Sequence, residues 1–155
     1  MNNIINENLI NLDVKGTTKE EVVFELAELI DQEGRLVDYG KYCTNVMERE
    51  KLSTTGIGFG IAIPHGKCIS VKEPTVAYGK KKEGLEWESL DGTPAQMIFL
   101  IAVPDESESN VHLKILAALS RKLMDEDFRA ELLKADDAKT VLSLLDQTFQ
   151  KALEN

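Results

Sequence analysis

The sequence predicts an α/β fold in which helices cover both faces of a central, mixed β-sheet. Amphipathic helical segments alternate with short apolar runs, the pattern of a sheet packed between helices. The run Met97–Val103 is continuously apolar, as expected of a strand buried on both faces. No obvious crossover helix joins the expected strands Ile61–Ile63 and Thr75–Tyr78, so the sheet should not be purely parallel.

Two helices are expected in the first third of the chain. Thr18 is followed three residues later by Glu21, a capping-box pattern, and the apolar residues beyond repeat at helical spacing until Gly34. Asp38 is the expected N-cap of a second helix that runs to about Lys51. The inward-facing residues of that helix are predicted to be Tyr42, Val46 and Met47.

Loops and three further helices account for the remaining chain. Ser53–Gly60 contains three glycines at alternate positions, which predicts a tight loop, and Glu83–Pro94 is turn-rich. Pro104–Asn110 is a polar connection in which Ser109 or Asn110 can cap the next helix. The expected helices are Val111–Met124 (with His112, Leu116, Leu119 and Leu123 on one stripe), Glu126–Lys134 and Asp137–Ala152. Because no linker or repeat interrupts residues 1–155, we expect a single domain.

Composition excludes several classes of function. The formal net charge of -9 argues against nucleic-acid binding, which depends on neutralising phosphates with Lys and Arg. The start of the chain, Met1–Asn11, has neither the basic region nor the apolar run of a signal peptide. The longest apolar stretch, Met97–Val103, is far short of the ~20 residues that span a bilayer. With only Cys43 and Cys68, the chain has no disulfide framework, so we expect a reducing cytoplasm and no insertion into a membrane.

His65 is the leading candidate for chemistry. A strand that ends at Pro64-His65-Gly66 delivers the imidazole to the edge of the sheet, and Gly66 keeps bulk away so that another protein can approach. A histidine that accepts a phosphoryl group needs a free neutral nitrogen, a fixed tautomer and donors for the phosphoryl oxygens. Taken alone, these three residues also fit a plain surface-loop histidine.

Four features near His65 can complete such a site. Backbone N–H groups of the Gly56–Gly60 loop can bind an anion, and Arg49 and Lys67 can offset the negative charge of the chain. The helix that begins near Val111 can aim its N-terminus, with His112, at the same place. Each feature has an ordinary alternative: a solvated helix end for Arg49, plain surface for Lys67, and a helix-end histidine resting on the apolar stripe for His112.

Other catalytic constellations find little support. The glycines do not match the dinucleotide fingerprint, and the chain has no Walker A motif. A zinc set of His65, Cys68, Cys43 and His112 lacks any recognised ligand spacing. A Cys-His hydrolase has no candidate oxyanion hole or orienting partner. We therefore expect neither a metal nor a cofactor.

The segment from Glu50 through Leu52–Gly66 closely resembles the signature of the fructose/mannitol-type (type 2) IIA proteins of the bacterial phosphoenolpyruvate-dependent sugar phosphotransferase system. The resemblance continues at Val103–Pro104 and Val111–Leu113 and covers about Leu9–Leu145. It implies a three-layer α/β/α sandwich around a mixed sheet, in a free-standing IIA subunit.

The resemblance also implies roles for individual residues. His65 matches the phosphoryl acceptor, which becomes a tele-phosphohistidine by transfer from phospho-HPr and then donates to a cysteine of a IIB component, with the membrane component IIC involved indirectly. His112 matches an assisting histidine, and Arg49 matches a basic position near the phosphoryl group. Because the donor already carries an activated N–P bond, neither transfer should need a metal ion or a nucleotide. The roles of Glu50 and Lys67 stay open.

Two functional interpretations follow from the resemblance. The first is a phosphoryl carrier in sugar uptake, with fructose as the first expectation for the sugar and with mannitol, galactitol and related sugars still open. The second is a nitrogen-type regulatory module, whose phosphorylation state controls binding to other proteins. The two differ in whether a sugar-specific IIB protein discharges phosphorylated His65 quickly.

Overall fold

Six strands form one mixed sheet with strand β6, Ala95–Pro104, at its centre. The computed structural model describes residues 4–105 and 110–153, the side chains of 111, 112, 152 and 153 excepted. Strand β6 pairs antiparallel with β5 and parallel with β3 and β4, and β1 pairs parallel with β5. The sheet is therefore mixed, as predicted. The other strands are β1 (Ile10–Asn11), β2 (Gly56–Gly58), β3 (Ile61–Ala62), β4 (His65–Cys68) and β5 (Thr75–Leu85).

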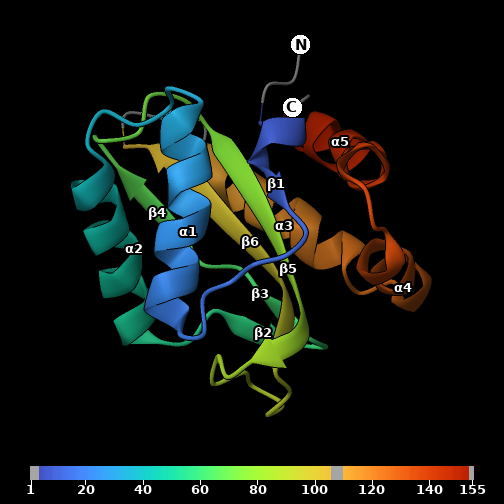
Figure 1. The fold of residues 1–155 in the computed structure, drawn as a ribbon. Helices are drawn as coiled ribbons and strands as arrows, with labels where there is room; N and C mark the ends of the chain where they lie inside the picture. Colours follow the sequence, from blue (N-terminus) through green and yellow to red (C-terminus); the bar gives the residue numbers. More distant parts are fainter. Residues whose placement is uncertain (1–3, 106–109, 154–155) are drawn as a thin grey trace.

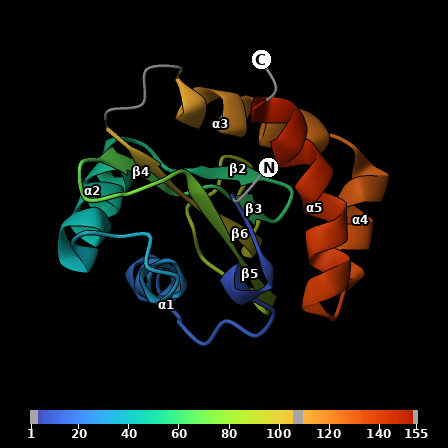
Figure 2. The same ribbon diagram turned by 90° about the horizontal axis from the view of Figure 1, so that it is seen from above.

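Helices cover both faces of this sheet and make the three layers that the sequence predicted (Figures 1 and 2). Helices α1 (Lys19–Gln32) and α2 (Tyr39–Leu52) lie on one face, where α1 contacts β5 and α2 contacts β4. Helix α3 (Val111–Lys122) lies on the other face and packs against α5 (Ala138–Leu153). Helix α4 (Glu126–Lys134) connects these two, and the short 3-10 helix η1 (Glu7–Leu9) contacts α5.

The first two helices begin and end where the sequence predicted. The side chains of Thr18 and Asp38 accept the N–H groups of Glu21 and Lys41, and so cap α1 and α2. Gly34 has a φ of 73°, the left-handed conformation that terminates a helix and that favours glycine. The predicted inward residues of α2 are fully buried at Tyr42 and Val46 and half-buried at Met47.

Helix α3 begins at Val111, as predicted, but without the expected side-chain cap. Asn110 occupies the N-cap position with a φ of 53°, and its side chain makes no capping hydrogen bond. The other predicted cap, Ser109, lies outside the described residues. Among the described side chains of α3 and its C-cap, the fully buried ones are Ile115, Leu119 and Leu123, four residues apart, while Leu116 is only half-buried. The side chain of His112, which was expected on this stripe, is not among those described.

Strand β5 is longer than predicted and runs into the segment expected to be turns. It continues to Leu85, where it still pairs with β6, and two lysines in its interior find backbone acceptors. Lys80 donates to the carbonyls of Leu133 and Ala135 at 2.9 and 2.7 Å, and Lys81 donates to the Val14 carbonyl at 3.3 Å. Satisfied in this way, both ammonium groups lie in the interior.

The hydrophobic core lies along both faces of β6, whose residues Met97–Val103 are all buried, as predicted. The Tyr42 hydroxyl on α2 donates to the Ile101 carbonyl at 2.9 Å and so joins that helix to the central strand. Among the described helices, none has both the length and the apolarity that crossing a bilayer requires.

Candidate functional site

His65 begins strand β4, which resumes the line of β3 after a two-residue interruption. Ile61 lies opposite Met97 and His65 lies opposite Ile101, so the register along β6 is the same on both sides of the interruption. Pro64 has no N–H to give to a strand ladder, but its carbonyl accepts the Ile101 N–H at 3.0 Å. The predicted stop of the strand at Pro64 is confirmed, because β3 ends at Ala62, but the new strand that begins at His65 was not predicted. His65 is nevertheless at the edge of the sheet, since among the described strands β4 pairs with β6 alone.

The interruption leaves the carbonyl of Ile63 available to the histidine ring. His65 Nδ1 lies 2.9 Å from this oxygen. A carbonyl oxygen only accepts hydrogen bonds, so Nδ1 carries the proton and Nε2 of the neutral ring has a free lone pair. The bond fixes the tautomer and makes Nε2 the nucleophilic nitrogen.

The surroundings keep this ring neutral. Burial lowers the pKa of His65, and the Arg49 guanidinium lowers it further. The hydrogen bond to Ile63 and the Glu50 carboxylate act in the opposite direction, but the net shift is downward. At neutral pH the imidazole is therefore a free base, which is the form that can attack an electrophile.

Glu50 is held close to the histidine by an extensive set of hydrogen bonds. The carboxylate is buried and accepts the Thr55 hydroxyl at 2.5 Å, the Thr55 N–H at 2.9 Å and the Lys19 ammonium at 3.1 Å. Trp87 Nε1 donates to the Thr55 hydroxyl oxygen at 3.2 Å. This cluster fixes the chain that leads from α2 into β2.

Two charged candidates occupy different positions around His65. The Arg49 guanidinium, in the last turn of α2, donates to the Ser53 carbonyl at 3.0 Å and acts electrostatically on the His65 ring. The structure therefore brings Arg49 to the site. Lys67 lies two residues beyond His65 in β4, half-buried, opposite Val103.

Gly66 serves a different purpose from the one predicted. A Cβ added there would lie 2.6 Å from Asn45 Oδ1 and 2.9 Å from Val46 Cγ2. The missing side chain therefore makes room for α2 and not for a partner protein. Since side chains alternate along a strand, the His65 side chain points to the other face of the sheet, which α3 covers (Figure 2). The second predicted histidine, His112, lies in the first turn of α3, and its side chain is outside the described parts.

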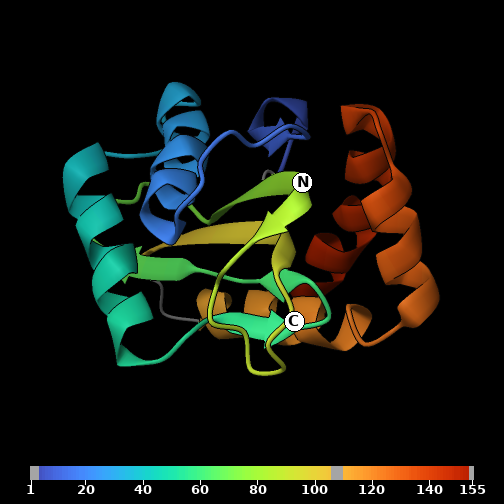
Figure 3. The ribbon, with the colours of Figure 1, turned by 60° about the horizontal axis from the view of Figure 1, so that its bottom comes forward.

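The glycine-rich segment is a β-hairpin of β2 and β3 (Figure 3), and three of its N–H groups already have side-chain acceptors. Gly58 and Gly60 have φ values of 99° and 78°, which explains two of the three glycines. The N–H groups of Phe59 and Gly60 donate to Asp91 Oδ2 and to Thr93 Oγ1, and that of Gly56 donates to Thr54 Oγ1. These donors are already occupied.

Sequence reasoning missed Lys19, Thr55 and Trp87. Lys19 and Trp87 are distant in the chain from the signature. Nothing in the sequence around them indicates that Lys19 contacts Glu50 or that Trp87 contacts Thr55. Thr55 lies within the signature, but the pattern does not show that its N–H and hydroxyl bind the Glu50 carboxylate. Among the described residues, no three His, Cys, Asp or Glu side chains gather in a way that could hold a metal ion.

Comparison with known proteins gives the family. Residues 3–148 match the family of phosphoenolpyruvate-dependent sugar phosphotransferase system, EIIA 2. The chain belongs to this EIIA type 2 family. It is therefore a phosphotransferase component, and a role as a phosphoryl carrier is supported.

Relatives of this EIIA chain include free and fused proteins. It is 41% identical over 142 residues to a fructose-specific EIIA component of Haloferax volcanii, with 92% of each chain covered. It is 40% identical over 144 residues to the fructose-specific EIIABC component of Bacillus subtilis, covering 93% of this chain and 22% of that longer protein.

Solved structures similar to the EIIA chain share nearly its whole length. The nitrogen regulatory protein IIA-Ntr of Neisseria meningitidis is 32% identical with a TM-score of 0.84, and the match covers 92% of this chain and 96% of that one. In a complex of enzyme IIAMTL and phosphorylated enzyme IIBMTL from Escherichia coli, the matching chain is 25% identical with a TM-score of 0.78, over 92% and 97% of the two chains.

Proposed function

We propose that this chain is a cytoplasmic phosphoryl carrier in sugar uptake, which accepts a phosphoryl group from phospho-HPr on His65 and donates it to a cysteine of a IIB component. The main support for the proposal is one observation: the hydrogen bond of His65 Nδ1 to the Ile63 carbonyl leaves Nε2 as the free nucleophile of a neutral ring. The product is then a tele-phosphohistidine, with phosphorus on Nε2.

Each transfer replaces one bond to phosphorus with another: an N–P bond with an N–P bond in the first, and an N–P bond with an S–P bond in the second. The Nε2 lone pair attacks phosphorus as the N–P bond of phospho-HPr breaks, and the electron pair of that bond returns to the donor imidazole. In the second transfer, a IIB thiolate attacks the same phosphorus, an S–P bond forms, and the electron pair of the Nε2–P bond returns to His65. Both steps depend on orientation and on charge stabilisation, because the phosphoryl group is already activated.

Two residues are proposed to assist these transfers. Arg49 lies close enough to act on the His65 ring, and its guanidinium can donate to phosphoryl oxygens on Nε2. His112 belongs to the first turn of α3, on the sheet face to which His65 points, and we propose that it assists as a hydrogen-bond donor.

The choice of partners rests on two relatives. A IIB partner is supported by the fused EIIABC relative and by the IIA–IIB complex. Fructose is the first candidate for the sugar, because both relatives described above are named fructose-specific. A regulatory function is the second candidate, supported by the likeness to a nitrogen regulatory protein.

The decisive experiment is phosphorylation with phosphoenolpyruvate, enzyme I and HPr, followed by intact mass and an acid-stability test. We expect one added phosphoryl group that is acid-labile and absent from His65→Ala. We expect His112→Ala to become phosphorylated on His65 more slowly. Labelling of His65→Ala at the wild-type level would refute the site. Rapid discharge by a sugar-specific IIB protein would favour the carrier, and its absence would favour the regulator.

A further inference from the structure

Lys19, the first residue of α1, lies between the site and the segment that carries Trp87 and Glu88. Its ammonium contacts Glu50 Oε2 at 3.1 Å and Glu88 Oε1 at 2.9 Å. The Glu50 side chain is only 4% exposed and that of Lys19 is 17% exposed, whereas Glu88 is 76% exposed. The pair with Glu50 is thus shielded from water, so that losing one partner would leave the other charge poorly compensated, while the pair with Glu88 is weakened by solvent.

A continuous series of hydrogen bonds leads from Lys19 to the His65 ring. Glu50 Oε2 accepts the Thr55 N–H at 2.9 Å, and the Thr55 carbonyl accepts the Ile63 N–H at 3.0 Å. The Ile63 carbonyl, in turn, accepts the proton of His65 Nδ1 at 2.9 Å. The position of each group in this series depends on the group before it, and the last one selects the tautomer of the histidine.

Trp87 reinforces the middle of the series from a second direction. Its Nε1–H donates to the Thr55 hydroxyl oxygen at 3.2 Å, and the same hydroxyl donates to Glu50 Oε1. The Trp87 carbonyl accepts the Thr54 hydroxyl at 2.8 Å. The Lys19 ammonium also lies 5.8 Å from the centre of the Trp87 ring, within the range of a cation–π contact.

We propose that Lys19 is a positioning residue for phosphoryl transfer at His65, acting through Glu50 and the peptides of Thr55 and Ile63. This rests on the proposed role of His65 as the acceptor. The ammonium holds the buried carboxylate in place, so that the Nδ1–H tautomer persists. It also compensates the negative charge of Glu50, which would otherwise oppose a phosphoryl group arriving on Nε2.

The test compares substitutions of Lys19 with two matched controls. In Lys19→Met, we expect the rate of phosphorylation by phospho-HPr to fall about tenfold. A loss of this size is common in metal sites when a residue that orients a metal ligand is removed. Nitrogen-15 NMR of the ring should show a reduced share of the Nδ1–H tautomer. Lys19→Arg, which keeps the charge, should restore both. Glu88→Gln and Lys15→Met should behave as wild type, because the Glu88 carboxylate and the ion pair of Lys15 with Asp13 are both exposed to solvent.

The outcomes separate this inference from the proposed function. If wild-type protein is not labelled on His65, the proposed function fails. If wild type is labelled and folded Lys19→Met matches it in rate and tautomer, only the role of Lys19 is overturned. If Lys19→Met does not fold, Lys19→Met/Glu50→Gln replaces it, since this variant leaves no unpaired buried charge. Slower labelling and a reduced share of the Nδ1–H tautomer in this double variant would support the role of Lys19, and a folded double variant that matches wild type in both would overturn it.

Discussion

The helical layers on the two faces of the sheet are attached to it by different kinds of polar contact. On the α2 side, the groups that fix His65 are close in sequence: Glu50 and Thr55 are 5 residues apart, and His65 and Ile63 are 2 apart. On the α3–α5 side, the polar anchor is Lys80, which reaches carbonyls 53 and 55 residues away in the chain. The hydrogen bonds next to His65 are therefore local, and only Lys19 and Trp87 among the site residues described above reach it from 31 and 32 residues away, whereas the polar anchor of the opposite layer is entirely long-range.

This difference explains what the sequence could predict. The signature around His65 is compact, so Glu50, Arg49 and His65 can all be named as candidates from the sequence alone. The two interior lysines of β5 cannot, because a buried lysine is recognisable only by its acceptors, and those of Lys80 lie at the end of α4. The extra length of β5 was missed for the same reason.

The interruption at Pro64 shows a second limit of the sequence. Proline correctly indicated a break in the strand, but the register that continues on β6 is set by pairing with a segment more than thirty residues away. The hydrogen bond between His65 and Ile63 follows from that register. Lys19 joins the site only because α1 packs against α2, a tertiary contact that no local pattern encodes.

The largest loss of stability is expected when the hydrogen-bonded cluster around Glu50 is disrupted. In Glu50→Ala, the Lys19 ammonium and the Thr55 N–H lose their shared partner. The free energy of unfolding, measured with urea, should fall by about 3 kcal/mol, as for other pairs from which one buried ion is removed. Phosphorylation of His65 should fall with it.

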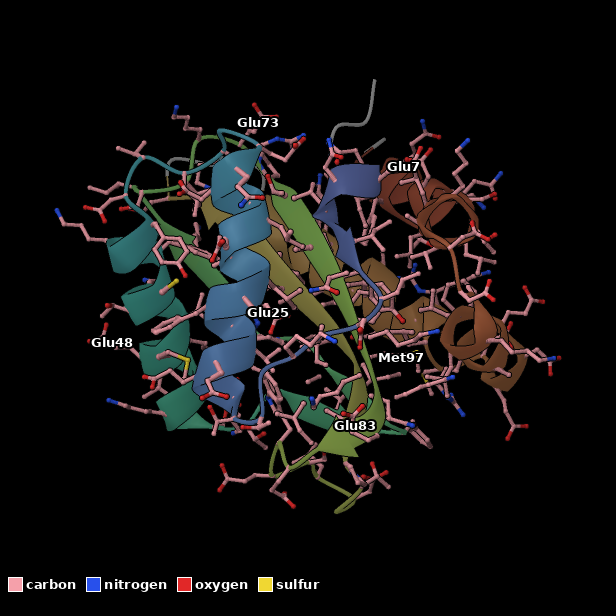
Figure 4. All side chains as sticks on the ribbon, in the orientation of Figure 1. Glu7, Glu25, Glu48, Glu73, Glu83 and Met97 are labelled. Carbon is pink, nitrogen blue, oxygen red and sulfur yellow. The ribbon has the colours of Figure 1, made fainter. Side chains whose placement is uncertain are left out.

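Glu48 provides the matched control for that variant. It lies on the outward side of the same helix and is exposed (Figure 4). Glu48→Ala should change the free energy of unfolding by less than about 0.5 kcal/mol. If Glu50→Ala were equally mild, the buried network would not stabilise this region.

Breaking the contacts of Lys80 with the end of α4 should lower the stability of the protein but should not slow phosphorylation of His65. Lys80→Met removes two hydrogen bonds to the end of α4 and should lower the free energy of unfolding by about 1–3 kcal/mol. The rate at which His65 is labelled by phospho-HPr should stay at the wild-type value under native conditions. Lys82→Met, at an exposed position of the same strand, should leave both quantities unchanged. A labelling defect in folded Lys80→Met would show that the two regions are coupled.

A pair of glycine substitutions tests the close approach of α2 to β4. In Gly66→Ala, the new methyl group would collide with Asn45 and Val46, and the free energy of unfolding should fall by about 1–3 kcal/mol. Gly40→Ala adds the same atom to the exposed first turn of α2, where only Asp38 Oδ1 lies nearby, at 3.6 Å. That variant should be more stable than wild type by about 0.5–1 kcal/mol, since alanine favours a helix. Equal effects at both positions would contradict the packing described for Gly66.

The smallest expected effect is the pH dependence contributed by His65 itself. Burial holds the pKa of this ring below its usual 6.5, so the unfolded chain binds a proton more readily than the native protein does. The contribution is therefore fully present above pH 6.5 and is lost as the pH falls through 6.5 toward the native pKa. Urea unfolding at about pH 7.5 and about pH 5.5 should show a larger loss of stability in wild type than in His65→Gln, which has no ring to titrate. An equal loss in both would mean that His65 is no harder to protonate in the native protein than in the unfolded chain, which would remove the electrostatic basis for a neutral nucleophile at this position.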